Sequence, residues 1–94
     1  MDTPYGDTFA FEALAVAGTA VGFTAGTFQS AYAAVARVDG ARVRYRTDGT
    51  DPTGAVGMVA DPGDVIYINS SRDLQDIKFI RTGGSATVNA EFVR

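Results

Sequence analysis

The 94-residue sequence contains no cysteine, no histidine and no tryptophan. Without cysteine there is no disulfide framework, no thiolate nucleophile and no cysteine-ligated metal. Without histidine the chain lacks the side chain most often used as a general base and as a metal ligand. These absences argue against most classes of enzyme. We therefore expect a protein without enzymatic activity, catalytic residues, a metal or a cofactor.

Positive charge and long apolar runs are also scarce. Eight lysines and arginines stand against eleven acidic residues, which gives a formal net charge of -3. The three acids among residues 1–36 face no base in that segment, so they account for the whole excess. An acidic chain is a poor nucleic-acid or membrane-surface binder. No run reaches the roughly 18 apolar residues of a membrane-spanning helix. We expect neither nucleic acid nor membrane as a partner.

The length suits one domain. Residues 1–8 are polar and contain Pro4 and Gly6, which predicts an extended N-terminal arm before a single domain over 9–94. The β-forming residues among the alanines and glycines that follow predict strands at about 8–16 and 20–24. For residues 30–36 a short helix is an alternative, because the segment is rich in alanine and Ser30 is a suitable cap.

Turn signals separate the remaining apolar segments. The Asp39-Gly40 pair predicts a hairpin that joins strands 32–38 and 41–47. Pro62 and Gly63 predict a type II turn at 61–64, and the glycines of 82–85 predict another hairpin turn. Alternating apolar residues predict further strands at about 55–60, 64–69, 75–81 and 86–93. Strand 64–69 should direct Ile66 and Ile68 inward, strand 75–81 contains Ile77 and Phe79, and strand 86–93 places Val88, Ala90 and Phe92 on one face. Together these strands and turns predict an all-β fold: a small antiparallel β-sandwich or a jelly-roll-like barrel of seven to eight short strands.

Two sets of residues are candidates for a partner interface. Strand 41–47 directs Val43 and Tyr45 to one face and three arginines to the other. This arginine stripe either meets carboxylates of a partner or is a solvated face balanced by neighbours such as Glu12 or Glu91. The apolar, base-free first third either forms an interface or fills the core. The candidate interface residues are Tyr5, Phe9, Phe11, Arg42, Arg44 and Arg46.

Acidic residues gather in the predicted turns, at Asp48, Asp51, Asp61 and Asp64. Loop carboxylates can bind calcium, but aspartate in such turns usually bonds to nearby backbone instead. Catalysis by a carboxylate pair needs one desolvated group, whereas these side chains are predicted in open turns. The two glutamates fall on solvent-facing or edge positions of strands.

The part of the chain from about residue 37 to 94 resembles a known family. The residues that carry the resemblance are Val43-Arg44-Tyr45-Arg46-Thr47-Asp48-Gly49-Thr50-Asp51-Pro52-Thr53, Gly57, Pro62-Gly63-Asp64, Ile77-Lys78-Phe79-Ile80-Arg81 and Ser85-Ala86-Thr87-Val88. This pattern resembles small β-sandwich virion structural proteins of tailed bacteriophages. The first 36 residues carry no such resemblance.

The resemblance implies a structural role on a phage particle. It points to a capsid cement, or decoration, protein that stabilises the head by bridging subunits of the major capsid protein. Such a protein is commonly a homotrimer, is made in the host cytoplasm and lies on the virion surface. The alternative is a carbohydrate- or receptor-binding module of a tail or head fibre, for which Tyr5, Tyr32 and Tyr67 supply aromatic side chains.

Overall fold

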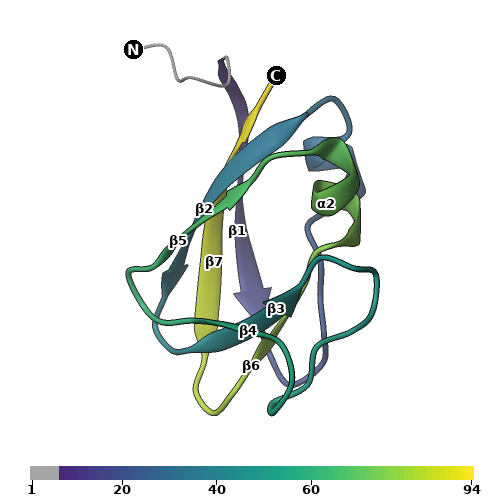
Figure 1. Cartoon of the computed structure of the whole chain (residues 1–94). Helices are drawn as coiled ribbons and strands as arrows, with labels where there is room; N and C mark the ends of the chain where they lie inside the picture. The colour runs from purple at the N-terminus through teal and green to yellow at the C-terminus, as the bar shows by residue number, and fades with distance from the viewer. Residues whose placement is uncertain (1–6) are drawn as a thin grey trace.

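A computed structural model of the chain describes residues 7–94, and its strands form two packed antiparallel sheets (Figure 1). The four-stranded sheet has the order β1-β7-β2-β5, and the three-stranded sheet has the order β4-β3-β6. Of the two architectures expected, the β-sandwich is the one formed, with seven strands. The strands are β1 (Thr8–Val16), β2 (Ala33–Asp39), β3 (Val43–Arg46), β4 (Met58–Ala60), β5 (Val65–Ile68), β6 (Lys78–Arg81) and β7 (Ala86–Val93).

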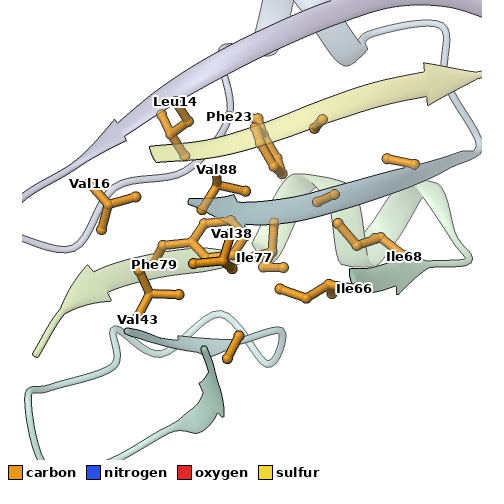
Figure 2. Packing of buried hydrophobic residues seen from close by; sticks show 14 of the residues in the cluster. Leu14, Val16, Phe23, Val38, Val43, Ile66, Ile68, Ile77, Phe79 and Val88 are labelled. Carbon is orange, nitrogen blue, oxygen red and sulfur yellow. The ribbon is translucent and has the colours of Figure 1, made fainter. Parts of the chain in front are cut away.

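The core lies between the sheets and is formed by the inward residues of the predicted alternation. Phe79 and Phe92 are fully buried, and the ring of Phe23 packs edge-on against both at centroid distances of 5.4 and 5.3 Å. Figure 2 shows Val38, Val43 and Val88 converging on the same interior. The inward positions of Ile66 and Ile68 were predicted and are confirmed. No polar side chain is buried in the described part of the chain.

The hairpin predicted at Asp39-Gly40 is wrong, although its turn residue is right. Gly40 has the positive φ of 91° that the turn requires. The chain then crosses to the other sheet, so β2 pairs with β7 and β5 and not with β3. Residues Ala33–Asp39 align with β7 over their whole length. This long-range partner decides the pairing, and local turn chemistry cannot reveal it.

The other two predicted turns also carry the chain between sheets. The turn at 61–64 joins β4 to β5, with a positive φ at Gly63 and a hydrogen bond from the Asp64 amide to the Asp61 carbonyl. The loop at 82–85 joins β6 to β7. The three connections β2 to β3, β4 to β5 and β6 to β7 therefore each lead from one sheet to the other, and each such pair of strands with its turn is here called an arch. Their order in one sheet, β7-β2-β5, matches the order of their partners in the other, β6-β3-β4.

Two predicted strands are only partly formed, and two short helices occur that were not predicted. Residues 20–24 form only an isolated bridge, in which Val21 exchanges two backbone hydrogen bonds with Phe79. The predicted strand at 75–81 begins only at Lys78, because α2 (Ser71–Asp76) precedes it. A single turn of helix, α1 (Ala25–Phe28), occurs in the first third. The alternative helix over 30–36 is wrong, since Ala33 begins β2.

The two ends of the described chain lie together. The amide of Asp7 donates to the carbonyl of Arg94 at 3.2 Å, and the amide of Arg94 donates to Asp7 at 3.1 Å. Thr8 already belongs to β1, so the sheet begins slightly before the boundary expected for the arm. The rest of the predicted arm, with Tyr5, lies outside the described residues. Within residues 7–94 no helix has the length and apolarity needed to cross a bilayer.

Candidate interaction surfaces

The outward side of the four-stranded sheet, here called the outer face, carries the two most exposed aromatic rings among residues 7–94. Phe11 on β1 and Tyr67 on β5 are each 59% exposed. The pairing register places them in one row across all four strands: Phe11 opposite Glu91, Glu91 opposite Val35, and Val35 opposite Tyr67. Three strand spacings separate the two aromatic positions, about 14 Å. The outer face thus has an exposed aromatic at each of its two edges.

A shallow groove of about 270 Å³ crosses the outer face between these edges. Its lining combines apolar side chains with a carboxylate, an amide and a guanidinium: Phe11, Val35, Val65, Glu91, Asn89 and Arg37. The amide of Asn89 donates to the Asp39 carboxylate at 2.6 Å, which fixes its orientation. The groove therefore offers apolar area together with oriented polar groups.

The phenylalanines of the first third, which include the predicted interface residues Phe9 and Phe11, divide between surface and interior. Phe11 points outward, as an interface residue must. Phe9 is half-buried against the core, with the Arg94 guanidinium 4.4 Å above its ring. Phe23 is buried and Phe28 packs partly against the core. The apolar first third therefore contributes to the core, and its exposed residue Phe11 stays a candidate for an interface.

The arginine stripe is bound within the chain. The Arg42 guanidinium donates to Asp61 at 2.6 Å, and that of Arg46 donates to Asp48 at 2.5 Å. Arg44 donates to two backbone carbonyls, of Gly54 and Gly57, at 3.2 and 2.9 Å. These partners differ from Glu12 and Glu91, the neighbours expected from the sequence. All three arginines hold the loops that flank the three-stranded sheet, and their role toward a partner stays a prediction.

Three of the four loop carboxylates, those of Asp48, Asp61 and Asp64, also bind within the chain. The hydrogen bond from Arg46, with a second from the Thr50 amide, lowers the pKa of Asp48 below its ordinary range. The same contact raises the pKa of Arg46, and the bond to Asp61 raises that of Arg42. Asp64 accepts from the Asp61 amide at 2.7 Å. Among residues 7–94 no three acidic side chains come together as metal ligands.

A second apolar patch surrounds β4 at the edge of the three-stranded sheet. Val56 and Met58 are 52 and 63% exposed, and Val59, which alternation directs to the other side of β4, is 42% exposed. Val56 and Met58 also line a shallow hollow beside Arg46 and Asp48. A larger hollow, of about 660 Å³, separates α1 from α2. Its charged lining residue, Arg72, pairs with Asp76 on the same helix, so this hollow presents no free ionic partner.

Glu12 has a structural role that the sequence did not indicate. Burial along β1 alternates, which places Glu12 on the inward side with Leu14 and Val16. One carboxylate oxygen of Glu12 accepts from the Thr24 amide and the other from the Thr24 hydroxyl, both at 2.9 Å. Thr24 is the N-cap of α1, and its own side chain makes no cap bond. Glu12 therefore ties the start of α1 to the edge strand.

Replacing Glu12 with alanine should destabilise the fold by about 1 kcal/mol, because two hydrogen bonds to a charged acceptor are lost at a partly solvated site. Urea unfolding measures the loss, and amide exchange should accelerate at Thr24. Glu91→Ala is the matched control, since Glu91 is the other glutamate of the chain, lies exposed on the outer face and should cost less than about 0.5 kcal/mol. Equal effects of the two substitutions would show that Glu12 does not hold α1.

Every buried side-chain nitrogen or oxygen of the described residues has a hydrogen-bond partner. The prominent features of the surface are instead the exposed apolar side chains on the outer face and around β4. Comparisons of the chain with protein-family models, curated proteins and solved structures found no match.

Proposed function

We propose that this protein is a non-enzymatic structural component of a tailed-phage particle, a cement protein that bridges subunits of the major capsid protein at the particle surface. The observation that carries the proposal is the exposure of large apolar side chains on two separate surfaces, the outer face and the β4 patch. Exposed apolar patches mark interaction sites. A bridging protein needs at least two such surfaces, because it contacts more than one neighbour.

The arrangement of charge supports the same role. Two arginines of the stripe, Arg42 and Arg46, are neutralised by the loop acids Asp61 and Asp48, so they offer a partner little free charge. Exposed apolar area is therefore the main contribution that these surfaces can make to a contact. Burial of such area stabilises an interface by roughly 25 cal/mol per Å². Specific interfaces bury about 1,200–2,000 Å². Contacts of this size, repeated around a shell, would stabilise it against expansion and heat, and self-association into a homo-oligomer, for which we expect a trimer, would multiply them.

The proposal is tested on the phage particle that encodes the chain. Gradient-purified particles should contain the protein, and gold-labelled antibody should mark their heads. Particles made without the gene should release DNA at a lower temperature, and purified protein added back should restore the original temperature. Absence from purified particles would overturn the proposal, and label confined to tails would favour the second candidate.

The second candidate is a carbohydrate- or receptor-binding module of a tail or head fibre, and the outer-face groove favours it. Ligand sites combine an apolar lining with a few oriented polar groups. Here Phe11 and Val35 lie beside Glu91, Asn89 and Arg37. Titration of host polysaccharide should then shift the amide resonances of these residues. Unchanged spectra at millimolar saccharide would exclude this candidate.

A further inference from the structure

We infer that copies of this chain join edge to edge, with β5 of one copy pairing antiparallel with β1 of the next. The first observation is that both outer strands of the four-stranded sheet have one free edge. In the described residues β1 pairs with β7 alone and β5 with β2 alone. Neither strand makes a further backbone hydrogen bond along its other edge to the described chain. Unpaired edges are templates for pairing with another strand.

Strand direction makes the two edges complementary to each other. Each neighbouring pair in the four-stranded sheet is antiparallel, so β1 and β5, at its two ends, run in opposite directions. A second copy in the same orientation therefore places its β1 antiparallel to β5 of the first. The same step can be repeated from copy to copy. Such head-to-tail contacts generate closed rings when the rotation closes, a trimer among them.

The sequences of both edges permit this contact. β5 reads Val-Ile-Tyr-Ile and has no charge and no proline, the features that usually protect an edge. β1 carries one charge, Glu12, which is directed inward and already bound to Thr24. Inward residues have even numbers on both strands, so an even residue opposite an even one keeps the core side of the sheet continuous.

The exposed aromatics decide between this contact and a two-fold contact of β1 with β1. Phe11 and Tyr67 are equally exposed and occupy the two free edges of one row on the outer face. The head-to-tail junction brings Tyr67 of one copy beside Phe11 of the next, and aromatic cross-strand pairs are favourable. It also places Val65 opposite Ala13. A two-fold β1 contact would leave Tyr67 and the whole β5 edge unpaired.

This inference deepens the proposed function and rests on the homo-oligomer proposed there. Substitutions that introduce like or opposite charges at Phe11 and Tyr67 test it. The wild-type chain should have a solution mass several times 9.8 kDa by light scattering. The double variant Phe11→Lys/Tyr67→Lys puts like charges at each junction and should be monomeric. Phe11→Glu/Tyr67→Lys puts opposite charges there and should restore the oligomer. Circular dichroism checks that both variants fold, which both exposed positions permit.

Cross-linking fixes which edges meet, and the absence of native cysteine makes it specific. When Phe11→Cys and Tyr67→Cys chains with different tags are mixed and oxidised, a disulfide should join the two kinds of chain. Within one chain the two positions are about 14 Å apart, too far for a disulfide, whose Cα atoms lie within about 7 Å.

Three results would overturn the inference: a wild-type monomer at millimolar concentration, Phe11→Cys chains linked mainly to each other, or a charge-exchanged variant that stays monomeric while folded. None of these bears on whether particles contain the protein. Conversely, an oligomer with this junction that is absent from particles would overturn the proposed function alone.

Discussion

Replacing Phe79 with alanine is expected to remove a large part of the stability of the fold, about 3–5 kcal/mol. Phe79 is fully buried, and its ring contacts Phe23 at 5.4 Å and Tyr45 at 5.9 Å between centroids. Its backbone also exchanges two hydrogen bonds with Val21. The cavity left by the ring would therefore lie where the two sheets and segment 17–24 meet. The free energy of unfolding of a native domain is roughly 5–15 kcal/mol in total, so the variant should unfold at a clearly lower temperature than the wild type.

Urea unfolding measures the effect of Phe79→Ala, with the midpoint falling and the slope unchanged. The matched control is Phe11→Ala, the same substitution at an outward position, measured at low concentration so that assembly does not contribute. It should change stability by less than about 0.5 kcal/mol. Similar losses at both positions would contradict the inward and outward sides assigned to these two rings.

Alternation in the sequence was enough to predict most strands and the faces they bury. The reason is physical: successive side chains of a strand point to opposite faces, so a half-buried strand must alternate. Val43 and Tyr45 turn inward while Arg44 turns outward, as predicted. In β7, Val88, Ala90 and Phe92 are buried, again as predicted. Local periodicity is visible within a few residues, and it predicted an all-β fold while leaving the sandwich and the barrel both open.

Connectivity could not be predicted in the same way. The turn residues at Gly40 and Gly63 were identified correctly because a positive φ favours glycine. Whether the chain then folds back beside the same strand or crosses to the second sheet depends on partners far along the chain. β2 pairs with β7, about fifty residues later. No local pattern carries that information.

Helix α2 was missed although it had a recognisable signal. Ser70 accepts a hydrogen bond from the Asp73 amide at 3.0 Å, and the Ser-x-x-Asp spacing of residues 70–73 is a known N-terminal signature. Leu74, fully buried, then follows on the first turn. Apolar residues nearby at Ile77 and Phe79 favoured a strand, and the strand prediction was extended too far toward the N-terminus.

The candidate surface was only partly visible in the sequence. Phe11 was selected because an apolar, uncharged segment suggests an interface, and it is exposed. Tyr67 was selected only as an aromatic for sugar binding, since nothing local showed that it shares a row with Phe11. The arginines were selected for their charge, but their nearest acids come from loops 2 and 19 residues away, whose approach depends on the fold.

A second large effect is expected from Gly40→Ala, about 3 kcal/mol of destabilisation from two separate causes. Gly40 has a φ of 91°, a conformation that disfavours any side chain. In addition, a Cβ atom there would lie 2.7 Å from the backbone carbonyl oxygen of Ser85. That oxygen belongs to the loop between β6 and β7, so relief of the contact requires two neighbouring arches to move apart.

Gly63→Ala separates the two causes, because Gly63 has the same φ of 91° and no atom within 4 Å of the added Cβ. It should cost only the conformational term, about 1 kcal/mol, and it keeps the hydrogen bond from its amide to Val38. Thermal and urea unfolding of both variants give the difference, which measures how tightly the arches pack. Equal losses of unfolding free energy in the two variants would mean that the turn at Gly40 adjusts to the added Cβ atom and that the neighbouring arches are not in close contact. A larger loss at Gly40, with faster amide exchange at residues 82–85, is the result expected of three arches packed side by side.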